Sequence, residues 1–395
     1  MTALLALALA IAGSVALLTA IFLGAEIAAS FFYRVPDLNL VGARGRIAVI
    51  IPAHNEATGI ALAIKAATKE LVAGDRIVVV ADNCSDETAA TARTAGAEAI
   101  ERSNKDLLGK GFAMQFGIDH LRADPPEIVI FLDADCVPAV GAIDRIAKIA
   151  RATSRPVQAL YLANPPPNSG AASSISAFAW LLINRVRMAG LQTLGGFSRL
   201  TGSGMALPWA MIANRRLATG EIVEDLAFTT TLVEEGHAPL LDLGSLIQSD
   251  LARSEAGAAI QRARWEFGSM RLALRKAGAL LGLGLSGDSR SLLLALDLMI
   301  PPLTVFYAVI LAGAILSLPF AFAGHSSALW LFWSAGLLAT GSIMIAWLAY
   351  GRSVLPPETL AGLGDYLIRK IRVYFGEGRK SAERWTRTDR GDNQS

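Results

Sequence analysis

The chain contains 395 residues, and its formal net charge of +2 gives no reason to expect a nucleic-acid partner. Hydrophobic residues account for 53% of the sequence and charged residues for only 18%, whereas ordinary soluble domains carry about 25% charged residues. The mean hydropathy of +0.44 agrees with this excess. The composition therefore excludes an ordinary soluble enzyme.

Three long apolar runs account for the excess of hydrophobic residues. Residues 1–33 contain one charged residue, Glu26, residues 291–324 contain one, Asp297, and residues 326–351 contain none. Each run exceeds the roughly 20 residues that cross a bilayer as a helix, so about three transmembrane helices are expected.

The first two runs need a closer definition. The first has no basic residue before it and is longer than the apolar core of a cleaved signal peptide, which favours a retained membrane anchor. Pro301 and Pro302 interrupt the second run. We therefore expect its span to begin near Leu303, with residues 292–300 at the membrane surface and Asp297 in contact with water.

Positive charges flank these runs on one side. The short loop near His325 contains no Lys or Arg, and none precedes the first run. The positive-inside rule then places the N-terminus outside, and the globular middle and the C-terminal tail in the cytoplasm. This location argues against a disulfide between Cys84 and Cys136. The basic residues that follow the first and third runs include Arg34, Arg44, Arg46, Arg352, Arg369, Lys370, Arg372, Arg379, Lys380 and Arg384.

Strand and helix patterns alternate in the first part of the globular middle. Each strand pattern is a continuous apolar run, which is typical of a parallel sheet covered by helices on both faces. Ser85 is the predicted N-cap of the second helix. The segments are a strand with its turn at 46–57, a helix at 59–74, a strand, turn and helix at 76–92, a short strand at 97–100, a turn and helix at 109–121 and a strand at 127–135.

The second part of the globular middle shows more helix than strand. Its last helix is basic and amphipathic, as expected at a cytoplasmic membrane face. The segments are a loop at 162–174, an apolar helix with basic insertions at 176–191, a glycine-rich turn entering a strand at 201–209, a helix with acids in its first turn at 221–237, and the basic helix at 258–282.

Polar residues follow three of the predicted strands. Ligands of open α/β sheets bind beyond the carboxyl ends of the strands, so we expect these residues at one rim. Asp133 and Asp135 offer hard oxygen ligands that suit Mg²⁺ or Mn²⁺, although solvated acids would show the same short motif. The polar residues at the rim are His54, Asn55, Glu56, Asp82, Asn83, Asp86, Asp133 and Asp135.

Lys110 and Asp82 each allow two interpretations. Lys110 lies between two glycines at a helix start, where it can meet a phosphate or simply extend into solvent. Asp82 ends a strand, where it can contact a base or ribose, or cap the following turn.

Two groups further along the chain are similarly ambiguous. Glu224 and Asp225 begin a helix, where a carboxylate can accept a proton from a hydroxyl or interact with the helix dipole. Gln261 and Trp265 lie one helical turn apart, with Arg264 alongside. A tryptophan offers a platform for a sugar and an arginine suits phosphate, but the same residues can anchor a helix at the membrane interface.

Taken together, these motifs resemble those of the membrane-anchored family 2 glycosyltransferases, which include cellulose, chitin and hyaluronan synthases and bacterial exopolysaccharide enzymes. They occur in the family's order over about 47–265, and the flanking apolar runs match its usual layout. The matching segments are IPAHNE, ADNCSDET, KG at Lys110, DAD at 133–135, ED at 224–225 and Q-x-x-R-W at 261–265.

The resemblance implies an α/β fold of the GT-A type, with a Rossmann-like, mostly parallel sheet. It implies a metal-dependent, inverting hexosyltransferase that uses a UDP-sugar, with Asp225 as general base and Asp135 as the ligand of Mg²⁺ or Mn²⁺. The implied donor-binding residues are Ala53, Glu56, Asp82, Lys110 and Asp133. The implied residues for the acceptor and diphosphate are Gly202, Ser203, Gly204, Glu224, Gln261, Arg264 and Trp265.

The same resemblance implies exopolysaccharide or cell-surface glycan synthesis on the cytoplasmic face of a bacterial-type inner membrane. The acceptor would be a lipid-linked or growing saccharide, and membrane lipids and other polysaccharide-assembly proteins would be partners. The expected parts are an N-terminal transmembrane helix at 1–34, a cytoplasmic GT-A domain at 35–256, interfacial helices with Q-x-x-R-W at 257–300, two transmembrane helices at 301–351 and a basic cytoplasmic tail at 352–395.

Alternative functions are a single sugar addition to a polyprenyl-linked acceptor and a non-catalytic membrane scaffold. Three spans are fewer than cellulose synthases have, which leaves processive synthesis and single addition both open. A nucleotidyltransferase is disfavoured, because the turn PAHNEA after the first strand has neither a glycine nor a basic residue. The sequence does not identify the sugar, the linkage or the acceptor.

Overall fold

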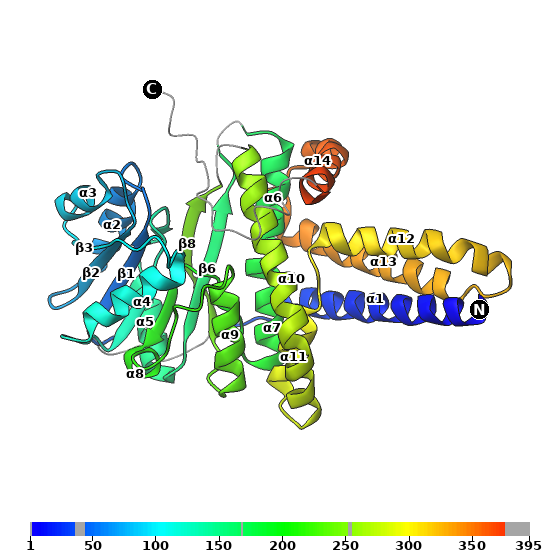
Figure 1. Cartoon of the computed structure of the whole chain (residues 1–395), viewed down its shortest axis with the longest axis horizontal. Coiled ribbons are helices and arrows are strands. Elements are labelled where there is room, and N and C mark those ends of the chain that lie inside the picture. The colour runs from blue at the N-terminus through cyan, green and yellow to red at the C-terminus, as the bar shows by residue number, and fades with distance from the viewer. Residues whose placement is uncertain (1, 36–43, 167–168, 252–254, 376–395) are drawn as a thin grey trace.

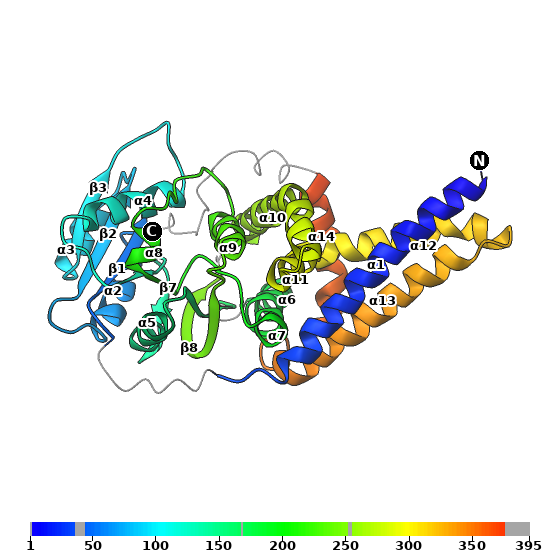
Figure 2. The same ribbon diagram turned by 90° about the horizontal axis from the view of Figure 1, so that it is seen from below.

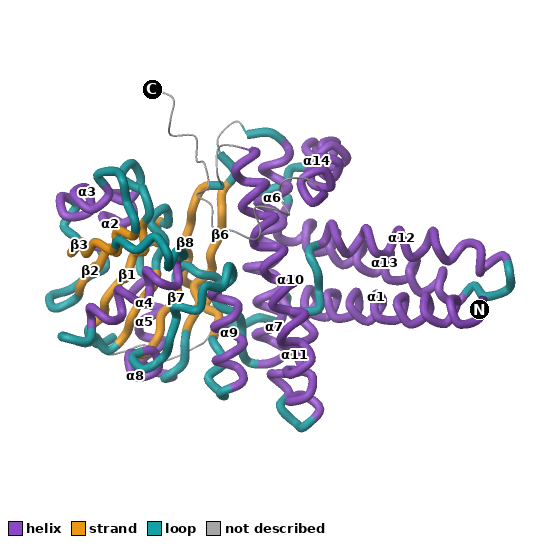
Figure 3. The backbone as a smooth tube through the Cα atoms, in the orientation of Figure 1, coloured by secondary structure: helices purple, strands orange, loops and turns teal. Residues whose placement is uncertain are grey.

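The structure is a computed structural model that describes residues 2–35, 44–166, 169–251 and 255–375. Three long helices extend from an α/β domain (Figure 1). The strands lie together on the side away from these helices, and further helices lie between the two parts (Figure 3). The predicted α/β architecture with three long apolar helices is therefore confirmed.

Eight strands form one sheet in the order β3-β2-β1-β4-β7-β6-β8-β5. Strands β3, β2, β1 and β4 are parallel, as predicted, and β6 is parallel to β8. Strand β7 is antiparallel to β4 and β6, and β5 is antiparallel to β8, so the sheet is mostly parallel, as the family resemblance implied. The strands are β1 Ile47–Ala53, β2 Arg76–Asp82, β3 Glu98–Arg102, β4 Ile128–Phe131, β5 Val137–Pro138, β6 Val157–Asn164, β7 Met205–Pro208 and β8 Leu240–Asp250.

The reversed direction of β7 matters for the site. Met205, the first residue of β7, pairs with Phe131, the last residue of β4. The amino end of β7 therefore lies beside the carboxyl end of β4, and the turn at 202–204 reaches the rim that Asp133 occupies. A parallel strand at this place would have put its amino end at the opposite edge of the sheet.

Helices cover both faces of the parallel half, which explains its continuous apolar strands. Alternate side chains of a strand point to opposite faces. Ile51 of β1 packs in one buried cluster with Ile64, whereas the neighbouring Ile50 packs in another cluster with Ile118. The covering helices are α2 Ile60–Thr68, α3 Thr88–Thr94, α4 Lys110–Leu121 and α5 Ala142–Thr153.

The predicted N-cap of α3 is wrong. The helix begins at Thr88 rather than directly after Ser85. The carboxylate of Asp86 accepts a hydrogen bond from the backbone N–H of Thr88 at 3.1 Å, so Asp86 satisfies a free amide at the helix start.

Most of the remaining helices lie between the sheet and the long helices, whereas α8 packs on the sheet through Met211 and Ile212. Figure 2 shows α10 and α11 between the sheet and the long helices, in agreement with Figure 1. The remaining helices are α6 Ala171–Leu181, the π-helix η1 Leu182–Arg187, α7 Met188–Gly195, α8 Trp209–Ile212, α9 Glu224–Glu234, α10 Glu255–Leu285, α11 Ser289–Leu298, the π-helix η2 Trp347–Gly351, the 3₁₀ helix η3 Pro357–Gly362 and α14 Leu363–Phe375.

Three described helices are long and apolar enough to cross a membrane. They are α1 Thr2–Ser30, α12 Leu303–Phe322 and the segment Ser327–Gly351, which comprises α13 Ser327–Ala346 and η2. Helix α12 begins at Leu303, the residue near which the second span was predicted to begin. The predicted tail contains α14, and residues 376–395 of it lie outside the described residues.

A buried ionic cluster joins the long helices to the α/β domain. Arg187 Nε lies 2.8 Å from Glu26 Oε2, and Arg187 Nη2 lies 2.7 Å from Asp297 Oδ1. Arg199 Nη1 lies 3.1 Å from the other oxygen of Asp297. The expectation that Asp297 contacts water is therefore wrong, because it is 2% exposed. Burial raises the pKa of Asp297, but attraction to Arg199 and Arg187 lowers it by more. The pKa of Asp297 is therefore below its ordinary value.

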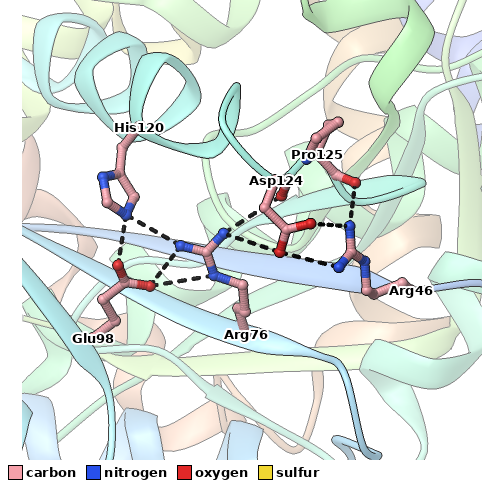
Figure 4. A network of polar contacts seen from close by, with 6 residues as sticks. All are labelled: Arg46, Arg76, Glu98, His120, Asp124 and Pro125. Carbon is pink, nitrogen blue, oxygen red and sulfur yellow. Dashed lines mark hydrogen bonds and ion pairs between the residues drawn. The ribbon is translucent and has the colours of Figure 1, made fainter.

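Ion pairs also connect the amino ends of β1, β2 and β3, at the edge of the sheet opposite the rim. Arg76 Nη2 and His120 Nε2 lie 2.7 and 2.6 Å from the two oxygens of Glu98 (Figure 4). Arg46 Nη2 lies 2.7 Å from Asp124 Oδ1. Arg46, Arg76 and Glu98 stand at the amino ends of β1, β2 and β3, so this edge has a structural role, and the rim at the carboxyl ends is the place for chemistry.

We expect Arg187→Met to destabilise the protein by about 3–5 kcal/mol, because it leaves the carboxylates of Glu26 and Asp297 buried without their shared partner. Thermal unfolding in detergent measures the loss. Arg93→Met is the matched control, since the Arg93–Glu101 pair is more than half exposed and contributes little. Equal melting temperatures for native protein and Arg187→Met would contradict this role of the cluster.

Candidate active site

The rim is formed by the ends of β1, β2 and β4 and by the turn before β7. Ala53 is the last residue of β1. Three residues later, the backbone N–H of Glu56 donates to Thr88 Oγ1 at 2.8 Å, which ties this turn to the start of α3. His54 Nδ1 lies 2.7 Å from the carbonyl oxygen of Asp82. The turns after β1 and β2 therefore form one connected wall.

Asp82 is buried in this wall, where its carboxylate has an arginine partner. Arg102 Nη1 lies 2.6 Å from Asp82 Oδ1, and Asn83 Nδ2 donates to the same oxygen at 3.0 Å. Burial raises the pKa of Asp82, although Arg102 opposes the shift. Sequence reasoning missed Arg102. The available signal was a basic residue at the end of the neighbouring short strand.

Lys110 links three segments that are distant in the sequence. It is the first residue of α4, and its Nζ lies 2.5 Å from Asp133 Oδ1 after β4. The same Nζ donates to the carbonyl oxygen of Gly202 at 2.8 Å. Ser203 Oγ in turn accepts a hydrogen bond from the backbone N–H of Asp133 at 3.0 Å. The predicted Lys110, DAD and glycine-turn residues are thus brought together.

Gly202 also marks the position of Asp225. A Cβ at Gly202 would lie 3.0 Å from Lys110 Nζ and 3.3 Å from Asp225 Oδ2, so both charged groups face this backbone. Gly202 and Gly204 have φ values of 82° and 69°, which favour glycine. Glu224 and Asp225 form the first turn of α9, and Asp225 Oδ1 accepts a hydrogen bond from the backbone N–H of Leu226. The predicted ED motif therefore reaches the rim.

Negative charge exceeds positive charge where Lys110 faces the carboxylates of the rim. Burial lowers the pKa of Lys110, but attraction to Asp133 and Glu224 outweighs it, and the pKa is raised overall. Burial, followed by repulsion from Asp225, raises the pKa of Glu224 to about 7. Burial also raises the pKa of Asp225, while Lys110 opposes the shift. One lysine facing several carboxylates leaves negative charge for a cation to neutralise.

Asp133 and Asp135 have the geometry of a cation site. One ligand atom each from Asp133, Asp135 and Cys136 lies within 4.8 Å of the others. The thiol of Cys136 is buried, and burial raises its pKa well above the ordinary value, so it stays protonated and is a poor ligand. The two carboxylates therefore fit Mg²⁺ or Mn²⁺, which prefer oxygen.

The Q-x-x-R-W residues lie on α10. The rings of Trp265 and Trp180 are 5.5 Å apart, and the ring of Trp180 is 5.2 Å from that of Tyr161. Burial lowers the pKa of Arg264, and attraction to Glu224 opposes this, so Arg264 lies within electrostatic reach of the rim. Gln261 lies one turn before Trp265 and is partly buried. Sequence reasoning missed the partner Trp180, although its helix was predicted.

The family comparison matches this part of the chain. Residues 48–204 match the family described as Glycosyl transferase family 2. This range includes β1 to β6 and every rim residue up to Gly204. No curated protein matches the sequence.

One solved structure supports the fold. The chain is similar to a mannosyltransferase from Pyrobaculum calidifontis in complex with GDP-Man and Mn²⁺, with 16% identity, a TM-score of 0.55 and coverage of 93% of this chain and 99% of that chain. It is less similar to glucosyl-3-phosphoglycerate synthase from Mycobacterium tuberculosis in complex with Mn²⁺, UDP-Glc and phosphoglyceric acid. That match has 20% identity, a TM-score of 0.37 and coverage of 53% and 75%, which is too weak to carry an argument.

The raised pKa of Glu224 predicts a pH-dependent stability. Between the ordinary pKa of 4.5 and the folded value of about 7, the folded chain keeps a proton that the unfolded chain loses. Rising pH through this window therefore destabilises the fold. We expect Glu224→Gln to raise the melting temperature relative to native protein at pH 8 and to leave it unchanged at pH 4.5.

The control for this comparison is Glu87→Gln, because Glu87 is an exposed carboxylate. Its difference from native protein should not vary with pH. A constant difference between Glu224→Gln and native protein from pH 4.5 to pH 8 would show that Glu224 titrates normally.

Proposed function

We propose that this chain, whose residues 48–204 match the family described as Glycosyl transferase family 2, transfers a sugar from a nucleotide-sugar to an acceptor hydroxyl at a membrane surface. The observation that carries the proposal is the convergence of Lys110, Asp133 and Asp225 around Gly202. This arrangement supports the proposal, because it would provide a cation, a carboxylate for a metal and a separate base beside one another. A non-catalytic scaffold has no need of that combination.

The wall around Asp82 is the proposed site of the nucleotide base. A carboxylate there can accept a hydrogen bond from a ring N–H of uracil or of guanine, while Arg102 holds the carboxylate in place. The family resemblance favours a UDP-sugar. The structurally similar mannosyltransferase was solved with GDP-Man, so donors of both kinds belong in the first assay.

Lys110 is the proposed partner of the donor diphosphate. Its charge is maintained by the surrounding carboxylates, and it stands at the start of α4, where backbone N–H groups also favour an anion. Asp133 and Asp135 would hold a divalent cation, which supplies Lewis-acid stabilisation of the leaving diphosphate when bound. Arg264 adds positive charge from α10 on the acceptor side.

Asp225 is the proposed general base. Its carboxylate takes the proton from the acceptor hydroxyl as the oxygen forms a bond to the anomeric carbon. The bond between that carbon and the diphosphate oxygen breaks on the opposite face, and the electron pair leaves with the nucleotide. One such displacement inverts the anomeric centre, so an α-linked donor yields a β-linked product.

The length and apolar character of α1, α12 and α13 support a membrane setting, and the positive-inside rule supports its orientation. We propose a multi-pass protein of the bacterial-type inner membrane with its catalytic domain in the cytoplasm. Its acceptor is a lipid-linked or growing saccharide in exopolysaccharide or cell-surface glycan synthesis. Single addition to a polyprenyl-linked acceptor is the second candidate, which three spans accommodate without a tunnel through the membrane.

The test of this function is incubation of membranes that contain the protein with radiolabelled UDP-sugars and GDP-sugars. We expect nucleotide release and label in a lipid-extractable or polymeric product. The product length separates single addition from polymerisation. Nucleotide release and labelled product both absent with every donor would favour the scaffold.

We expect Asp225→Asn to lower the rate of transfer by about 10²–10⁴-fold, since it removes the base and keeps the shape of the side chain. Donor affinity, measured by calorimetry, should remain close to native because Asp225 acts on the acceptor. Asp119→Asn is the control, as Asp119 is an exposed carboxylate on α4. Undiminished transfer by folded Asp225→Asn would exclude Asp225 as the base.

Chelation with EDTA should abolish transfer, and added Mn²⁺ or Mg²⁺ should restore it. Asp135→Asn should require a higher concentration of the cation for half-maximal rate, because it removes a charged oxygen ligand. The rate as a function of cation concentration measures both effects. Full activity after exhaustive chelation would rule out the metal.

A further inference from the structure

The position of Trp265 depends on its surroundings on α10 and α6. Its ring packs on Trp180 of α6, and Trp180 Nε1 donates to the carbonyl oxygen of Tyr161 at 3.0 Å. The tryptophan pair is therefore anchored to β6 on one side. The other side of α10 has a separate support, which comes from the C-terminal part of the described chain.

Glu266, the residue after Trp265, is held by α14. Lys370 Nζ lies 2.8 Å from Glu266 Oε1, and the hydroxyl of Tyr374 donates to Glu266 Oε2. The Lys370 and Glu266 side chains are 16% and 22% exposed, so this pair is better shielded from water than a surface ion pair. The ring of Tyr374 also lies 5.2 Å from the ring of Phe267 in an edge-to-face arrangement.

The same C-terminal segment contacts α6. Gly362 ends η3, directly before α14, and a Cβ at this position would lie 2.5 Å from the Cβ of Ala171 at the start of α6. Backbone and helix approach too closely there for a larger residue. Figure 2 shows α14 next to α10 at the base of the long helices. One segment thus contacts both helices that carry the tryptophan pair.

We propose that Glu266 is a positioning residue, held by Lys370 and Tyr374 of α14 so that Trp265 stays at the acceptor side of the site. The role follows from geometry. Trp265 and Glu266 are consecutive on α10, and the side chain of Trp265 packs on α6 while that of Glu266 contacts α14. This role rests on the proposed transferase function. Loss of the contact between Glu266 and α14 would affect where the acceptor sugar lies. The turns after β1 and β2, which form the proposed donor site, would be unaffected.

Lys370→Met tests this role in membranes that contain the full chain, with whichever radiolabelled donor the native protein turns over. The measured quantity is the ratio of label transferred to product to label released as free sugar. We expect this ratio to fall about tenfold. The donor still reacts, but a displaced acceptor hydroxyl attacks it less often than water does. Lys370→Arg keeps the cation and should retain the native ratio.

Two further variants exclude a general folding defect. Tyr374→Phe removes only a hydroxyl and should lower the ratio in the same direction, whereas Arg372→Met removes an exposed charge from the same helix and should not. A native ratio in Lys370→Met, or a parallel loss of transfer and hydrolysis in both Lys370→Met and Tyr374→Phe, would overturn the proposal. If native protein neither transfers nor hydrolyses, the proposed function itself fails.

Discussion

Arg187 provides the interaction that connects the two parts of the molecule. Its guanidinium contacts Glu26 on the first long helix and Asp297 on α11, and Asp297 also pairs with Arg199 shortly before the glycine turn. Buried charges are costly unless they are paired, so these four residues favour one arrangement of their elements. The rim is thereby held at a defined place relative to the three long helices.

Within the domain, Lys110 has the corresponding central position. It contacts Asp133 and the Gly202 carbonyl and faces the carboxylate of Asp225. Three segments with separate sequence motifs therefore share one electrostatic environment. Burial, followed by repulsion from Asp225, raises the pKa of Glu224 to about 7, and Lys110 opposes this shift. In the proposed function, the lysine would exchange part of these contacts for the diphosphate of the donor.

Much of the parallel half was predictable from local sequence. Strands β1, β2 and β4 are continuous apolar runs because helices cover both faces, and each run ends in polar residues at the same rim. The start of the second long helix at Leu303 was equally readable, since Pro301 and Pro302 exclude an uninterrupted helix. These features depend on residues that are neighbours in the chain.

The partners of Asp82, Asp297 and Glu266 could not be predicted from local sequence. Arg102, Arg187 and Lys370 are remote in sequence from the acids that they contact, and which pairs form depends on strand order and helix packing. The sequence by itself determined the three long apolar helices, the parallel strands and the residue types at the rim. Only the tertiary structure decided the direction of β7 and the burial of Asp297, because both depend on contacts between distant segments.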